Sequence, residues 1–171
     1  MKITIPPALM SAWAIKLHLQ RAIVALCGLL LTLIIFTLVV GRYVFNTSFL
    51  GIEEAAIFIA MWFYFIGGAI GAQQRGHISA SVVDMFVRNE TAQCAVSVAT
   101  GVISVVVAAW MTVWAWEFAA WSLQMGMRSM ELGVSMGWIH MSVPVGLGLM
   151  TFYLSVELVE NVATLARRLR G

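Results

Sequence analysis

Four long runs of the sequence contain no Asp, Glu, Lys or Arg, and they cover residues 22–41, 55–74, 91–116 and 132–156. A helix rises about 1.5 Å per residue, so about 20 residues cross the roughly 30 Å hydrocarbon core of a bilayer. Each run can therefore span a membrane once. With their flanking residues, the runs predict transmembrane helices over about 22–44, 52–74, 91–117 and 136–158, in one domain covering residues 1–171.

Two other architectures do not fit the pattern of apolar positions. A soluble four-helix bundle has a polar stripe on each helix, whereas residues 29–40 (LLLTLIIFTLVV) are apolar on nearly every side. A membrane β-barrel alternates apolar and polar residues with a period of two, and the four runs do not. The pattern predicts an all-α integral membrane protein with four transmembrane helices.

Two shorter stretches are amphipathic rather than uniformly apolar. Residues 8–20 follow Pro6 and Pro7 and repeat apolar side chains at a spacing of four. Residues 78–89 repeat apolar side chains on one face and carry charge on others. We expect short interfacial helices at the N-terminus and between the second and third spans. For residues 8–20 the alternative is that the first transmembrane helix simply begins early.

The composition agrees with a membrane protein and excludes several other classes. Hydrophobic residues make up 61% and charged residues 11% of the 171 residues, and the mean hydropathy is +0.93. Soluble domains average about 45–50% apolar and about 25% charged residues. A net charge of +2 is too small for a surface that follows nucleic-acid phosphates, so we expect no nucleic-acid partner.

The basic residues predict the orientation in the membrane. Eight of the ten Lys and Arg lie before the first span, between the second and third, or after the fourth. Only Arg42 and Arg128 lie in the other two connections. Cytoplasmic loops carry an excess of Lys and Arg, so both termini and the middle connection are predicted to be cytoplasmic. An apolar run that begins only at residue 22 also predicts an uncleaved anchor rather than a signal peptide.

Nothing in the sequence predicts a cofactor, a metal or an enzyme. Cys27 and Cys94 lack C-x-x-C spacing and fall near the reducing side, so we expect buried, unpaired cysteines. His77 and His140 are predicted near opposite membrane surfaces, too far apart to ligate one haem. No Asp, Glu, Lys or Arg is predicted at mid-membrane. Glu53 and Glu54 begin the second span, where stabilisation by the helix dipole and a functional role explain them equally well. A coupled transporter that acts alone usually carries a buried charge or an inverted repeat.

Packing signals suggest contact with another protein. The second predicted span has small-xxx-small steps that include Gly67 and Gly71, a pattern that lets helices approach closely in lipid. In the third, Trp110, Trp114 and Trp121 share one helical face with Glu117. An aromatic belt at the membrane surface explains the tryptophans most simply, and a docking surface is the alternative. Packing within the chain's own bundle is the alternative for the glycines.

Several short motifs follow one another in a fixed order along the chain. They are Arg42-Tyr43-Val44-Phe45-Asn46, Ser48, Glu53-Glu54, Trp62, Gly67 and Gln73-Gln74-Arg75-Gly76-His77-Ile78. The last span adds Trp138, Pro144-Val145-Gly146 and Leu149-Met150. This ordered set resembles one family, the DctQ-like small membrane subunit of tripartite ATP-independent periplasmic (TRAP) transporters.

The resemblance implies a function that the composition alone does not. It implies a non-catalytic scaffold in a bacterial or archaeal inner membrane, which binds a large multi-spanning transport subunit. The scaffold would help a periplasmic solute-binding protein to dock during sodium-coupled uptake of an organic acid. The alternatives are an accessory subunit of another membrane complex, or a stand-alone four-helix transporter. The candidate partner-contact residues are Arg42, Asn46, Glu53, Glu54, Trp62, Gly67, Gly71, Arg75, His77, Trp110, Trp114, Glu117 and Trp121.

Overall fold

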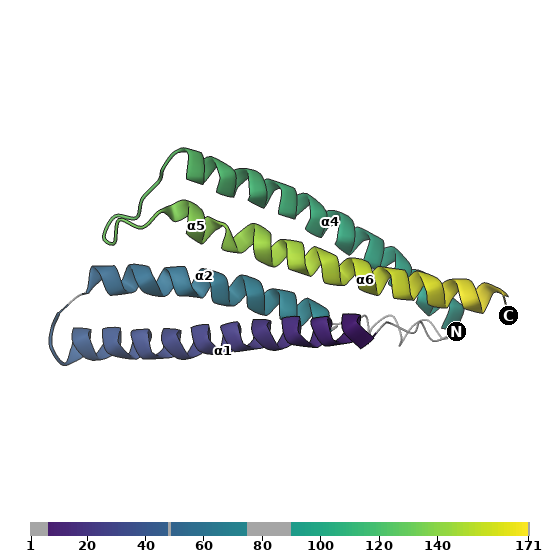
Figure 1. The fold of residues 1–171 in the computed structure, drawn as a ribbon, viewed down its shortest axis with the longest axis horizontal. Helices are drawn as coiled ribbons and strands as arrows, with labels where there is room; N and C mark the ends of the chain where they lie inside the picture. Colours follow the sequence, from purple (N-terminus) through teal and green to yellow (C-terminus); the bar gives the residue numbers. More distant parts are fainter. Residues whose placement is uncertain (1–6, 48, 75–89, 171) are drawn as a thin grey trace.

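The computed structural model describes residues 7–47, 49–74 and 90–170, and within them the chain is helical apart from two connections and one short interruption. The helices are α1 (Pro7–Tyr43), α2 (Leu50–Gln73), α4 (Glu90–Gln124), α5 (Met136–His140) and α6 (Ser142–Arg170). The connections α1–α2 and α4–α5 lie together at one end of the bundle, called here the loop end (Figure 1). The first turn of α1 and the last turn of α6 lie at the other, called the terminus end (Figure 1).

Four helical segments are long and apolar enough to cross a membrane, as the charge-free runs predict. They are Ile15–Tyr43, Leu50–Gln73, Ala92–Gln124 and Met136–Arg168, the last of which combines α5 and α6. In a bilayer, a helix satisfies its own backbone hydrogen bonds, which is why long apolar sequence adopts this form. The predicted all-α architecture with four spans is confirmed.

Several helix bounds differ from the predicted ones. α1 is continuous from Pro7, so residues 8–20 are its first turns and not a separate helix. This agrees with the alternative that the first helix begins early. α4 continues past Glu117 to Gln124, because an acidic residue near water does not end a helix. The second amphipathic stretch, 78–89, lies outside the described residues.

The fourth span is interrupted at Met141, between α5 and α6. Pro144 lies in the first turn of α6 and has no N–H to donate to the carbonyl of His140. The Ser142 hydroxyl donates to the carbonyl of Ile139 at 2.7 Å, and Met141 N–H still donates to Gly137. Proline therefore changes the helical hydrogen-bonding pattern locally, and the chain keeps its direction across Met141.

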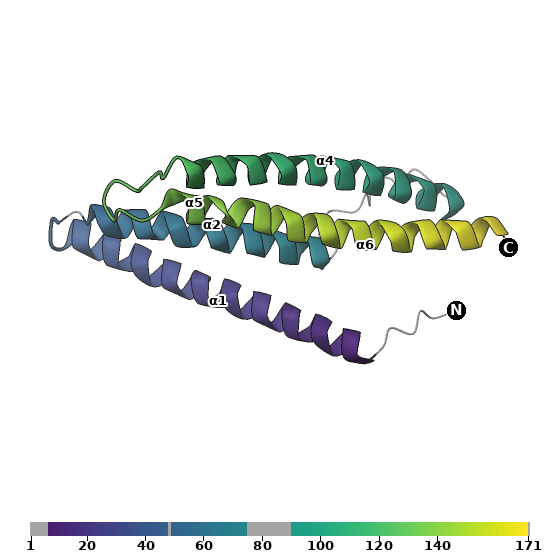
Figure 2. The same ribbon diagram turned by 45° about the horizontal axis from the view of Figure 1, so that its top comes forward.

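The long helices pack in the order α1, α2, α6, α4, with α2 against both α1 and α6 (Figures 1 and 2). Figure 2 shows α1 diverging from the other helices toward its N-terminal end. None of the most apolar window of α1 is buried, compared with 28% of that of the fourth span. α1 therefore presents most of its surface to lipid or to another protein.

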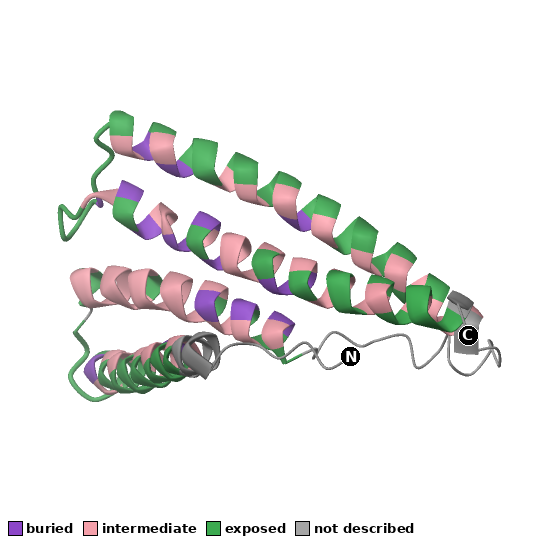
Figure 3. Cartoon of the chain, turned by 45° about the vertical axis from the view of Figure 1, so that its right-hand side comes forward, coloured by how far each residue is buried: buried purple, intermediate pink, exposed green. Residues whose placement is uncertain are grey.

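Buried residues concentrate where α2, α4 and α6 face one another (Figure 3). Ala69, Ala72 and Tyr153 form a buried cluster between α2 and α6. α6 approaches α2 closely at Gly146, where a Cβ would lie 2.6 Å from both Cβ and the carbonyl oxygen of Phe65. Small residues permit such close crossings. In lipid no hydrophobic force acts between helices, so dispersion between closely packed atoms stabilises the contact instead.

Several polar side chains in the spans bond to each other or to the backbone. Thr112 of α4 and Thr151 of α6 are joined at 3.1 Å between their hydroxyl oxygens. Near the terminus end, the Tyr153 hydroxyl donates to the amide oxygen of Gln20 at 2.6 Å, and both side chains are buried. Lys16 Nζ lies 4.6 Å from the centre of the Tyr153 ring. These contacts tie α1 and α4 to α6.

Candidate partner-binding surfaces

A single carboxylate fastens the connection α4–α5 to the start of α2. Both oxygens of Glu54 accept hydrogen bonds from successive backbone N–H groups, those of Met130 at 3.1 Å, Glu131 at 3.2 Å and Leu132 at 2.8 Å. Charge-assisted bonds to backbone N–H groups are among the stronger hydrogen bonds in proteins. Glu54 thus holds the tip of a loop 76 to 78 residues away in sequence.

The loop that Glu54 holds, residues 125–135, is an ordered hairpin, called here the outer hairpin. Met136 N–H donates to the carbonyl of Met127 at 2.8 Å, and Ser129 N–H to that of Val134 at 2.9 Å. The Ser129 hydroxyl accepts from Val134 N–H at 3.1 Å, and Ser129 is buried. Gly133 has φ +64°, a conformation that favours glycine. Hydrogen bonding from both sides fixes the shape of the hairpin.

Three other candidate residues also lie at the loop end. Arg42 is exposed in the last turn of α1, and Asn46 is exposed in the connection α1–α2 with φ +50°. Asn tolerates this left-handed conformation better than most residues, so the backbone explains its presence. Glu53 is half-buried in the first turn of α2 beside the Glu54 clamp. The structure thus gathers Arg42, Asn46, Glu53 and Glu54 at one end of the bundle.

The tryptophan face of α4 is exposed as the sequence pattern predicts. Trp110 is 60%, Trp114 63% and Trp121 47% exposed, and Glu117 between them is exposed too. The rings of Trp110 and Trp114 meet edge to face with centroids 5.7 Å apart. The other face of this part of α4 is anchored by Ser122, whose hydroxyl lies 2.9 Å from Nδ1 of His140. An exposed aromatic row suits either a bilayer interface or a protein partner.

The glycine face of α2 is not used to pack this bundle. A Cβ added at Gly67, Gly68 or Gly71 would meet no atom within 4 Å, whereas Ala69 and Ala72, which pack with Tyr153 of α6, are buried. Packing within the chain's own bundle therefore does not explain these glycines. The close helix crossing inside the chain uses Gly146 instead, a position that the small-xxx-small pattern of α2 does not reveal.

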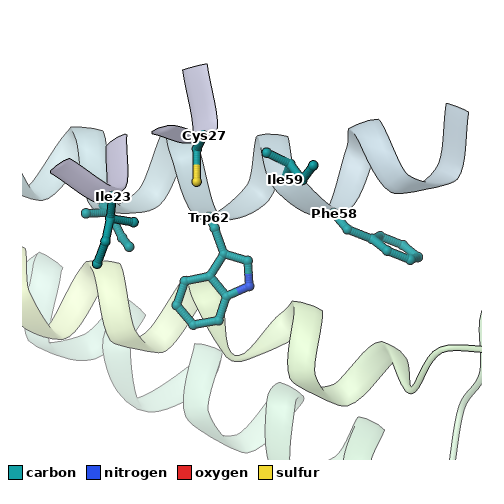
Figure 4. A pocket seen from close by; sticks show the side chains of 6 residues that line it. Ile23, Cys27, Phe58, Ile59 and Trp62 are labelled. Carbon is teal, nitrogen blue, oxygen red and sulfur yellow. The ribbon is translucent and has the colours of Figure 1, made fainter. Parts of the chain in front are cut away.

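An apolar hollow of about 300 Å³ lies between α1 and α2, one turn from the glycine face. Figure 4 shows Trp62 of α2 beside Cys27 of α1, with the indole directed away from α1. The lining has no polar surface and consists of Ile23, Cys27, Phe58, Ile59, Trp62 and Ile66. Such a hollow can hold a hydrocarbon chain or an apolar side chain.

The described residues contain no group of three or more His, Cys, Asp or Glu placed to hold a metal ion. Cys27 and Cys94 are both free and half-buried. Arg75 and His77, two of the candidate contact residues, lie outside the part of the chain that the structure describes.

The fold defines a class, a small helical membrane protein with four apolar spans and an ordered hairpin at one end. The comparison of families then identifies the chain within that class. Residues 31–164 match the family described as tripartite ATP-independent periplasmic transporters, DctQ component, and the chain belongs to that family. It is the small subunit of a TRAP transporter and a multi-pass inner-membrane protein. No curated protein matches the chain.

Proposed function

We propose that this chain is a non-catalytic scaffold that holds the large transport subunit in the membrane and helps the solute-binding protein to dock. The observation that carries the proposal is the family match over residues 31–164. The substrate would be an organic acid taken up with sodium, and the chemistry of coupling would belong to the large subunit. No nucleic acid or cofactor is involved.

The proposed orientation places the loop end in the periplasm and both termini in the cytoplasm. It rests on the distribution of Lys and Arg in the sequence, because Arg42 and Arg128 alone fall between the first and second or the third and fourth charge-free runs. The outer hairpin and the Glu54 clamp would then face the compartment of the solute-binding protein. The tryptophans of the α4 face, Trp110, Trp114 and Trp121, would lie toward the same side of the membrane.

The glycine face of α2 is proposed as the contact for a helix of the large subunit. Gly67 and Gly71 leave backbone uncovered, and close backbone approach is what such positions provide in lipid. Trp62 in the adjacent hollow would extend the contact area. The remaining candidate residues, Arg42, Asn46, Glu53, Glu117, Arg75 and His77, are proposed as polar contacts near the membrane surfaces.

Reconstitution into liposomes tests the proposal. We expect sodium-driven uptake with this chain, the large subunit and the solute-binding protein together, and none with this chain and the binding protein alone. Removal of this chain should lower uptake and the recovery of a stable large subunit together. Uptake by this chain without the large subunit would instead favour a stand-alone transporter. Stable, fully active large subunit without this chain would contradict a scaffold role.

A further inference from the structure

We propose that the outer hairpin is a docking point for the solute-binding protein, with Met130 as its central apolar contact. This inference rests on the proposed function and adds the surface that performs it. Met130 is 98% exposed although it lies in a hairpin whose backbone is hydrogen-bonded on both sides. Met130 is therefore exposed on a backbone that the Glu54 carboxylate holds in place.

The hairpin displays a cluster of apolar side chains outside the membrane spans. Residues 125–135 lie between the spans that end at Gln124 and begin at Met136. Apolar side chains held in water gain free energy when a partner covers them. The exposed apolar members of the cluster are Met125 (63%), Met127 (37%), Met130 (98%), Leu132 (46%) and Val134 (43%).

The position of the hairpin favours a soluble partner over the bilayer or the large subunit's helices. Leu132 packs over the first turn of α2, where a Cβ on Gly51 would lie 3.3 Å from its methyl group. The hairpin therefore sits by the start of α2 at the loop end, as Figures 1 and 3 show. In the proposed orientation, the N-terminus of α2 and everything beyond it face the periplasm.

Carboxylates beside the cluster favour a partner that carries basic groups. Glu131, next to Met130, is exposed, and Glu53 lies in the first turn of the helix that the hairpin contacts. The nearby cation, Arg128, directs Nη1 back to the carbonyl of Gly133 at 3.4 Å. An apolar tip beside carboxylates fits a partner surface with an apolar notch and a basic rim, since complementary charge steers such encounters.

Methionine suits a contact that forms and breaks in every transport cycle. Its unbranched, polarizable side chain adapts to different surfaces and is common where one surface meets several shapes. A solute-binding protein must dock when loaded and leave when empty, so its contact has to tolerate two conformations. Three of the five exposed apolar residues of the hairpin are methionines.

Binding of the purified solute-binding protein to the assembled transporter in nanodiscs tests the proposal. Met130→Leu keeps an apolar side chain and should leave the Kd within about twofold. Met130→Glu removes apolar contact and should raise the Kd roughly tenfold, which is the scale of one buried apolar side chain. Met130→Lys adds repulsion from the basic rim and should raise it further. If all three variants have the same Kd as the unaltered transporter, the proposal is overturned.

A second measurement identifies what covers Met130. In a variant with Cys27→Ala and Cys94→Ala, we expect Met130→Cys to react with a membrane-impermeant maleimide in the assembled transporter. Added binding protein should slow that reaction. A cysteine already protected before the addition means that the bilayer or the large subunit covers the hairpin, and contradicts the proposal. If the unaltered transporter fails to bind the solute-binding protein at all, the proposed function itself fails, and not only this surface.

Discussion

Glu54 accepts a 2.8 Å hydrogen bond from the backbone N–H of Leu132, although the two residues are 78 positions apart. Two further N–H groups, those of Met130 and Glu131, share the same carboxylate. α2 and the connection α4–α5 are thereby joined at the loop end, in addition to the packing of α2 on α6 in the membrane. The shape of the outer hairpin thus depends on one side chain of α2.

Glu54→Gln should loosen the hairpin without unfolding the bundle. The glutamine amide has one acceptor oxygen, and its NH₂ group cannot accept from the loop N–H groups. We expect hydrogen exchange of the amides at Met130, Glu131 and Leu132 to quicken several-fold. Glu53→Gln is the matched control, because no described hydrogen bond joins Glu53 to the hairpin, and exchange there should not change. Equal exchange in both variants would show that the clamp does not order the loop.

Gly146→Ala should destabilise the chain, because its Cβ would lie 2.6 Å from the backbone oxygen and the Cβ of Phe65. Backbone cannot rotate away as a long side chain can, so α2 and α6 must separate, at a cost of about 1–3 kcal/mol. Gly148→Ala is the control, since its Cβ would only touch Thr112 at 3.8 Å. Thermal unfolding in detergent should show a lowered Tm for the first variant alone.

Gly67→Leu and Gly71→Leu should leave the isolated chain intact and weaken its association with the large subunit. A Cβ at either position meets no atom of this chain within 4 Å, so a side chain can leave the α2 backbone there without a clash at its first atom. Ala69→Leu is the contrasting control, because Ala69 is 1% exposed and its replacement should lower the Tm of the chain itself. Normal co-purification of both glycine variants with the large subunit would remove this face from the proposed contacts.

Reporter fusions test the orientation. A reporter that is active only in the periplasm should give signal when fused after Asn46 or near Arg128. It should give none after Gly76 or at Gly171. The expectation follows from the scarcity of Lys and Arg in the two loop-end connections. Periplasmic activity of the fusion at Gly171 would overturn the arrangement with both termini in the cytoplasm.

The four spans could be predicted because each long helix contains an apolar run free of charge, and the length of that run can be compared with the thickness of a bilayer. Helix ends were less predictable for a physical reason. Glu117 marks where side chains meet water, but the backbone of α4 stays helical to Gln124. Likewise, the amphipathic residues 8–20 run into the first span without a break, because no helix-breaking residue separates them from it.

The surfaces could be predicted only in part. The exposure of Trp110, Trp114 and Trp121 follows from helical spacing, which fixes which residues share a face. The Glu54 clamp could not be predicted, because its partners are backbone N–H groups that carry no sequence signal, and the helix dipole explained the glutamate equally well. The close contact of Gly146 with Phe65 depends on how two distant helices cross, which spacing within either helix does not determine.

The most direct test of a scaffold role is uptake by the assembled transporter as a function of sodium concentration, normalised to the amount of complex recovered. We expect Glu53→Ala, Glu54→Ala and Glu117→Ala to leave the normalised sodium dependence unchanged. Loss of uptake that extra solute-binding protein restores would reflect impaired docking, as the position of Glu54 beneath the outer hairpin suggests. A variant that assembles fully yet changes the Hill slope for sodium would place this chain in the coupling machinery and contradict the scaffold role.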